Sequence, residues 1–200
     1  MILRSSPTSP FGRKIKIALD VLGLADTVSV VSTDTLDPED TIRQQNPLGK
    51  IPALLLDDGT VLYDSRVIVE YLDQLAGGGR ILPGGSERFR ILTLQALADG
   101  IMDAAILQIY EIRFRAEDRR EPKWIEHQAA KVERGLFSLN ASQLPEIRTT
   151  PDIGSIALAC ALGYLDFRFE GKWRSGHENL IRWLASFSNA VPAFVATMPR

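Results

Sequence analysis

Residues 46–52 read Asn-Pro-Leu-Gly-Lys-Ile-Pro and lead into an apolar, strand-like run that ends at Leu56. A proline at the start of a strand, here Pro52, has no N–H to donate to a neighbouring strand. If the Ile51-Pro52 bond is cis, the N–H and C=O of Ile51 point outward and can pair with an extended peptide ligand. A turn proline without a ligand explains the same residues equally well.

The sequence on both sides of this segment alternates short apolar runs with helical periodicity. Strands are expected at residues 2–5, 28–31, 51–56 and 60–63, and helices at 10–22, 38–44 and 65–75. Asp58-Gly59 joins the last two strands as a hairpin. The order β-α-β-α-β-β-α predicts a thioredoxin-like α/β domain over residues 1–76.

The second half of the chain shows no strand pattern. Gly77-Gly78-Gly79 begins a linker-like stretch over residues 77–85. Residues 86–200 then predict a C-terminal helical bundle, so the fold class is α/β plus all-α. Helices are expected at 86–115, 122–139 and 152–167. The third is apolar all round, which favours the centre of the bundle, and Asp152 with Ser155 predicts a capping box at its start.

Composition excludes several classes of protein. The net charge of −2 gives no excess of positive charge for phosphates, so we expect no nucleic-acid partner. The first residues lack the apolar core of a signal peptide, and no bilayer-spanning stretch is expected, which indicates a soluble cytoplasmic protein without a membrane partner. The single Cys160 cannot form an internal disulfide, and His127 and His177 lack a metal-ligand spacing, so no metal site is predicted.

Thr8-Ser9-Pro10-Phe11 stands where the first strand gives way to the first helix. Ser9 therefore occupies the N-cap position and Pro10 the first helical turn. Exposed N–H groups and the positive end of the helix dipole favour an anion here, and a thiolate over its thiol. Ser9 can equally be a cap and nothing more, and the hydroxyl of Thr8 is a rival for the same role.

Asp64-Ser65 opens another helix directly after the hairpin. Ser65 and the free N–H groups of this helix start can hold a carboxylate, while Asp64 supplies the charge that attracts an ammonium group. Such a pair of groups suits the amino-acid end of a γ-glutamyl peptide. Capping alone also explains these two residues.

Taken together, these motifs, with Arg13-Lys14 and Glu70-Tyr71-Leu72, resemble the N-terminal half of cytosolic glutathione transferases in order and spacing. The linker and the all-α second half resemble the C-terminal domain of that family. Residues 96–104 and 163–168 are most similar to a bacterial serine-type subgroup that includes the YibF-like proteins.

This resemblance implies that glutathione binds as co-substrate and that its thiolate attacks an electrophilic small molecule. Ser9, or Thr8 in its place, would stabilise the thiolate. Ile51 would pair with the cysteinyl backbone next to the Pro52 turn. The γ-glutamyl end would be held by Asp64-Ser65.

Further candidate residues follow from the resemblance, for Lys50, and from positions on the long helix, for the others. Lys50 would approach the glycine carboxylate of glutathione. Asp99 and Asp103 lie four residues apart and therefore share one helix face. One hypothesis is that they line the cleft that faces glutathione, either in the same subunit or across a dimer interface. The other is that they pair with Arg or Lys of a neighbouring helix. Tyr110 and Arg113 are candidates for the border of the second-substrate pocket.

The resemblance also implies a homodimer. The turn around Ser9 has no cysteine, which argues against disulfide exchange by a protein thiolate, and Cys160 fits a small core residue. The alternative function is a glutathione-binding or protein-interaction module with negligible turnover, as in the stringent starvation proteins that associate with RNA polymerase.

Overall fold

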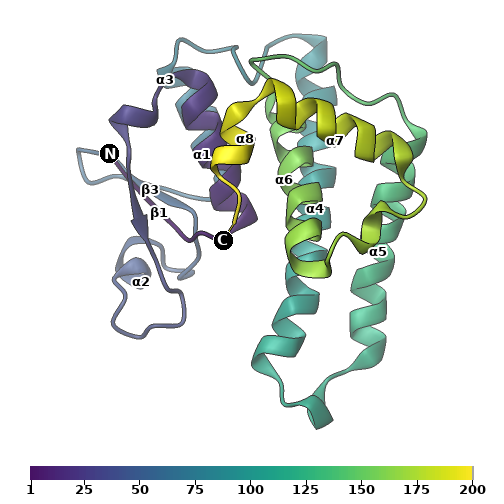
Figure 1. The fold of residues 1–200 in the computed structure, drawn as a ribbon. Coiled ribbons are helices and arrows are strands. Elements are labelled where there is room, and N and C mark those ends of the chain that lie inside the picture. The colour runs from purple at the N-terminus through teal and green to yellow at the C-terminus, as the bar shows by residue number, and fades with distance from the viewer. Residues whose placement is uncertain (200) are drawn as a thin grey trace.

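The computed structural model describes residues 1–199 and has the two-part architecture that the sequence predicts (Figure 1). A small mixed sheet with helices forms the N-terminal part, and helices alone form the rest. The N-terminal elements are β1 (Ile2–Ser5), α1 (Pro10–Leu22), the 3₁₀ turn η1 (Ala25–Thr27), β2 (Ser29–Ser32), α2 (Ile42–Gln45), β3 (Ala53–Leu55), β4 (Val61–Leu62) and α3 (Ser65–Leu75).

The four strands form one sheet in the order β2-β1-β3-β4. β1 runs parallel to β2 and antiparallel to β3, and β3 runs antiparallel to β4. The central strand carries Leu3, which is fully buried opposite Leu54 of β3. These two side chains join the apolar faces of α1 and α3 in the core.

Four N-terminal elements differ from their predicted bounds: β2 is shifted by one residue, β3 and β4 are shorter than expected, and α2 begins later. The helix expected at 38–44 begins only at Ile42, because the Asp40 carboxylate accepts the Ile42 N–H at 2.8 Å and holds the chain in a turn before the helix. Asp40 is itself fixed by Arg4, whose guanidinium lies 2.6 Å away. The last strand is shorter than expected and comprises Val61–Leu62.

The C-terminal part consists of α4 (Ser86–Phe114), the turn η2 (Glu117–Arg119), α5 (Pro122–Ala141), α6 (Ile153–Phe169), the turn η3 (Lys172–Arg174), α7 (Glu178–Ala190) and α8 (Pro192–Ala196). As predicted, α6 is central: every residue from Ile153 to Leu165 is buried, and α6 packs against α1, α4 and α7. Neither α7 nor α8 was predicted from the sequence. In Figure 1, α8 returns the chain to the side of α1.

The predicted capping box at the start of α6 forms only in part. Asp152 accepts the N–H of Ser155 at 2.8 Å, as expected of an N-cap. The Ser155 hydroxyl does not reach back, since its oxygen is buried without a hydrogen-bond partner among residues 1–199. One carboxylate is therefore enough to cap this helix.

The expectation that no segment is long enough to span a bilayer requires a correction. By length and composition alone α4 qualifies, with an 18-residue window of mean hydropathy 1.3. Half of that window is buried inside the protein, where α4 packs against α5 and α6. The apolar residues of α4 therefore have a packing role in this fold.

Candidate functional site

The strand register gathers the predicted binding segments at one edge of the sheet. Arg4 near the end of β1 lies opposite Ala53 at the start of β3, so the turn after β1 adjoins the turn before β3. Leu62 at the end of β4 lies opposite Leu54, so the start of α3 reaches the same edge. Three predicted segments meet there: Thr8-Ser9, Ile51-Pro52 and Asp64-Ser65.

Ser9 is the N-cap of α1, as predicted. Its Oγ accepts the N–H of Gly12 at 3.0 Å, which leaves the hydroxyl proton free to be donated outward. Gly12 allows α1 to begin close to the sheet, because a Cβ there would lie 2.0 Å from the Ser5 Oγ. Capping and presentation of a donor are therefore compatible at Ser9.

Thr8 shares the surroundings of Ser9. Both residues are partly buried and both line a small cavity together with Tyr164 of α6. The Thr8 hydroxyl has no hydrogen-bond partner within residues 1–199, so it too can donate into this cavity. Both hydroxyls therefore stay candidates for the donor to the glutathione sulfur.

The Ile51-Pro52 peptide bond is cis, as the sequence analysis required for a peptide-binding edge. Within residues 1–199 no backbone hydrogen bond uses the N–H or C=O of Ile51. The Asn46 amide donates to the Lys50 carbonyl at 2.9 Å and so fixes the preceding turn. The Lys50 side chain is exposed at this edge.

Asp64 and Ser65 begin α3 as predicted. Asp64 is exposed and its Oδ1 accepts the N–H of Arg66 at 2.9 Å, so this residue is the N-cap. Ser65 is buried at the first position of the helix. An anion at this helix start would find unpaired N–H groups, and a cation would find the Asp64 carboxylate.

Asp99 is a buried member of an ion-pair cluster. Its side chain is 2% exposed and lies between Lys14 of α1, at 2.7 Å, and Arg66 of α3, at 3.0 Å. Of the two roles considered for Asp99, the structure therefore shows pairing with Lys and Arg. This ion pair links α1 and α3, the two helices whose N-termini carry the predicted binding residues, to α4.

Asp103, one turn further along α4, faces the same edge from the helical side. Burial, followed by the nearby Asp99 carboxylate, raises the pKa of Asp103. Arg66 and Lys50 oppose that increase because their positive charges lie close to the carboxylate. Asp103 therefore lies within electrostatic reach of Arg66 and Lys50, and it remains a candidate cleft residue.

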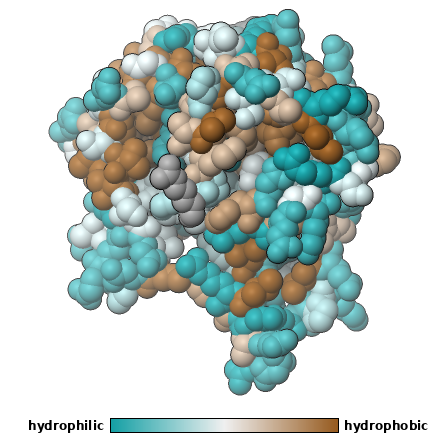
Figure 2. All heavy atoms as spheres, in the orientation of Figure 1, coloured by the Kyte–Doolittle hydropathy of each residue, from teal (hydrophilic) through white to brown (hydrophobic). Residues whose placement is uncertain are grey.

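The other candidates on α4, Tyr110 and Arg113, lie at its C-terminal end. Tyr110 is 43% exposed and packs edge-on against Phe114, with ring centroids 5.2 Å apart. The Arg113 guanidinium lies 5.9 Å from the centroid of the same ring. Figure 2 shows the surface notched where this end of α4 stands away from the N-terminal part.

Two residues of α6 near this region, Tyr164 and Arg168, were not predicted as site residues. Tyr164 lines the cavity at Ser9, and Arg168 lies 5.8 Å from its ring centroid. Burial raises the pKa of Tyr164, while the charges of Arg168 and Arg113 lower it. The sequence signal was present, since both residues follow the apolar run of α6, but their neighbours depend on the tertiary fold.

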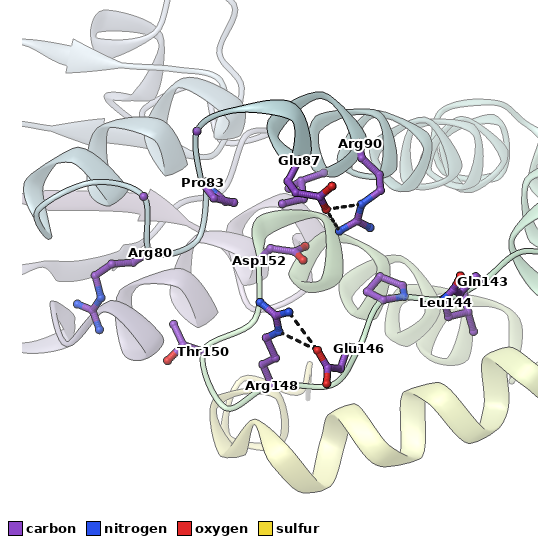
Figure 3. Close-up of a pocket in the computed structure, with 14 residues that line it drawn as sticks. Arg80, Pro83, Glu87, Arg90, Gln143, Leu144, Glu146, Arg148, Thr150 and Asp152 are labelled. Carbon is purple, nitrogen blue, oxygen red and sulfur yellow. Dashed lines mark hydrogen bonds and ion pairs between the residues drawn. The ribbon is translucent and has the colours of Figure 1, made fainter.

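A cavity of about 620 Å³ lies elsewhere, between the start of α4 and the loop before α6 (Figure 3). Four of its charged side chains form ion pairs, Arg90 with Glu87 at 2.8 Å and Arg148 with Glu146 at 3.0 Å, while Arg80 binds backbone carbonyls and Asp152 caps α6. Because these charges are compensated, we assign this cavity no ligand. Among residues 1–199, no group of three His, Cys, Asp or Glu residues is placed to hold a metal ion.

Comparison with known proteins agrees with this geometry. A family model described as Glutathione S-transferase, N-terminal domain matches residues 3–80, and one described as Glutathione S-transferase, C-terminal domain matches residues 122–186. The uncharacterized GST-like protein YibF of Escherichia coli K12 is 35% identical over 84% of this chain and 83% of its own length.

Solved structures give the same result. A glutathione transferase family member from Pseudomonas fluorescens Pf-5 with bound glutathione is 44% identical, with a TM-score of 0.92 over 100% of this chain and 98% of that chain. A second structure from that organism, with bound S-(propanoic acid)-glutathione, is 42% identical, with a TM-score of 0.85 over 100% of both chains. The chain belongs to the glutathione S-transferase family.

Proposed function

We propose that this protein binds glutathione at the sheet edge formed by Ser9, Ile51-Pro52 and Asp64-Ser65, and that it activates the thiolate for attack on an electrophilic small molecule. The observation that carries the proposal is the meeting of two helix N-termini and an unpaired backbone edge at one place. The sulfur then bonds to the electrophilic carbon, the leaving group departs with its electron pair, and the thiol proton passes to solvent.

The expected activation of the thiol can be given a magnitude. A hydrogen bond from the Ser9 hydroxyl to a thiolate is worth about 1.5 kcal/mol, and the N-terminus of α1 adds about 1 kcal/mol. Together they lower the pKa of the bound thiol by about two units, at about 1.4 kcal/mol per unit. At neutral pH a large share of the bound glutathione is then thiolate.

The remaining contacts orient the peptide. Ile51 offers a free N–H and C=O to the cysteinyl residue, as an edge strand does. The start of α3 accepts the γ-glutamyl carboxylate, and Asp64 pairs with its ammonium group. Lys50 would pair with the glycine carboxylate, and the charge of Lys50 also acts on Asp103.

The relatives support binding of glutathione and of its conjugates. The Pseudomonas fluorescens protein holds glutathione in one structure and an S-linked conjugate in another. By analogy, the cleft of this chain accommodates a group attached to sulfur. We further propose that it works in the cytoplasm as a homodimer, as the family resemblance implies.

The test removes one hydroxyl at a time. In Ser9→Ala we expect the rate of conjugation of chlorodinitrobenzene to glutathione to fall about tenfold when it is measured at a pH below the pKa of the bound thiol. The reason is that the thiolate loses its hydrogen-bond donor. Thr8→Val is the matched control, since it removes the neighbouring hydroxyl and keeps the side-chain shape. Loss of activity in Thr8→Val with an unchanged rate in Ser9→Ala would assign the sulfur to Thr8.

The alternative, a binding or interaction module with negligible turnover, predicts a different combination of results. Calorimetric titration would show glutathione binding, while conjugation by the native protein would not exceed the uncatalysed rate. If glutathione gave neither binding heat nor thermal stabilisation, both the enzyme hypothesis and the glutathione-binding-module hypothesis would be contradicted.

A further inference from the structure

Two arginines whose charges act on Tyr164 have no acidic partner within residues 1–199: Arg113 at the end of α4 and Arg168 at the end of α6. The nearest carboxylates in sequence are already engaged. Glu111 pairs with Arg115 at 3.0 Å, and Asp166 pairs with Arg174 at 2.7 Å. These two guanidinium groups therefore have no carboxylate partner among residues 1–199.

Arg168 also has an unused hydrogen-bond donor. Its Nε is buried and has no hydrogen-bond partner among residues 1–199. A buried donor without a partner is costly, so it favours any acceptor that reaches it. A carboxylate accepts from a guanidinium in the two-pronged geometry that a neutral group cannot reproduce.

Aromatic rings hold both guanidinium groups in place. Arg168 lies 4.5 Å from the ring centroid of Phe167 and 5.8 Å from that of Tyr164, and Arg113 lies 5.9 Å from that of Phe114. Stacking on a ring leaves the N–H edge of a guanidinium free for a planar anion. The rings themselves suit the apolar or aromatic body of a small molecule.

This charged and aromatic region adjoins the place proposed for the glutathione sulfur. Tyr164 lines one cavity with Ser9, and Arg113, Tyr110 and Arg168 all lie near Tyr164. A group bonded to a sulfur at Ser9 would have Tyr164 as a neighbour, with Arg168 next to that ring.

We propose that the electrophile carries a carboxylate, and that Arg168 and Arg113 bind this group while the aromatic side chains pack against its body. This inference rests on the proposed function of the Ser9 site and specifies its second substrate. A carboxylate on the electrophile is repelled by the thiolate, which has the same charge. The positive charges of the two arginines would offset this repulsion. The bonds formed and broken are those of the conjugation described above.

The test measures equilibrium binding, which does not depend on turnover. S-benzylglutathione and S-(para-carboxybenzyl)glutathione differ only in one carboxylate and are titrated into the native protein by calorimetry. We expect the carboxylated conjugate to bind at least tenfold more tightly, a difference of about 1.4 kcal/mol. In Arg168→Gln with Arg113→Gln this preference should fall below about twofold, while S-benzylglutathione still binds.

Controls separate charge at the site from charge elsewhere. Arg134→Gln on α5 removes the same charge from an exposed position and should leave the preference intact. Arg168→Lys keeps the charge, loses the planar fork and should retain part of the preference. If Arg168→Gln fails to fold, Arg113→Gln alone, at an exposed helix end, still tests the proposal.

Each outcome has a distinct meaning. Equal affinity of the native protein for the two conjugates would overturn the carboxylate proposal and leave the glutathione site intact. A preference that survives in the double variant would also overturn it. Failure of the native protein to bind either conjugate or glutathione would instead contradict the proposed function.

Discussion

The ion pair between Lys14 and Asp99 provides the most decisive stability test of this fold. The two side chains are 0% and 2% exposed, and their charged atoms lie 2.7 Å apart. Asp99→Asn keeps the shape of the side chain and removes its charge, so the Lys14 ammonium stays buried without a counter-charge. Arg66, the other partner of Asp99, is 53% exposed and can be hydrated instead.

Removing one member of a buried ion pair typically costs about 3–5 kcal/mol. We expect about 3 kcal/mol here, because the amide oxygen of asparagine still accepts a hydrogen bond from Lys14. For a chain of this length the loss corresponds to a fall in melting temperature of about 6–12 °C. Thermal and urea unfolding followed by circular dichroism would measure both quantities.

Two further variants make the reasoning refutable. Asp103→Asn changes the same residue type one turn away at an exposed position, and it should not destabilise the protein. Lys14→Met with Asp99→Leu removes both charges and should recover most of the loss, since apolar pairs often replace buried ion pairs without penalty. If Asp99→Asn costs less than about 1 kcal/mol, the ion pair does not hold the two parts together.

Three other outcomes are expected. Burial raises the pKa of Cys160 to about 11, so this thiol should react with iodoacetamide only after unfolding. Gly154→Ala should lower the free energy of unfolding, measured in urea, by about 1–3 kcal/mol, because the new Cβ would lie 2.8 Å from the Ile91 carbonyl oxygen. In the control Gly100→Ala the new Cβ has no atom within 4 Å, so this variant should not be destabilised. Because the pKa of Asp103 is higher in the folded state than its value of 3.8 in the unfolded chain, the stability contribution of Asp103 is fully present below pH 3.8. It is lost as the pH rises through the pKa of the folded state. The free energy of unfolding of Asp103→Asn, relative to the native protein, should therefore increase from about pH 4 to pH 7.

The sequence was sufficient for the architecture wherever local pattern determines it. The apolar run from Ile156 to Leu162 predicted a central helix, and it is fully buried in α6. The hairpin across Asp58-Gly59 and the helix starts at Ser9 and Asp64 also follow from local rules, and the structure has them.

The missed elements have different causes. α7 was detectable, because Leu180, Trp183, Leu184 and Phe187 have helical spacing and are all buried. The partners of Asp99 were not detectable, since Lys14 lies 85 residues away in sequence and only the packing of α1 on the helical part brings it near.

The candidate site also has one part that follows from local sequence and strand pairing and another that depends on helix packing. The register of β1, β3 and β4 explains why three motifs far apart in sequence meet at one edge. The arrangement of Arg113 and Arg168 depends on how the ends of α4 and α6 pack, which no local pattern encodes.

The pKa of the thiol in bound glutathione tests the central proposal most directly. It is obtained by following the ultraviolet absorbance of the thiolate against pH in the native complex and in Ser9→Ala. We predict a value about two units below the ~8.5 of a free cysteine thiol, with about half of that decrease lost in Ser9→Ala. A native value at or above that of the free thiol would contradict thiolate activation at this site.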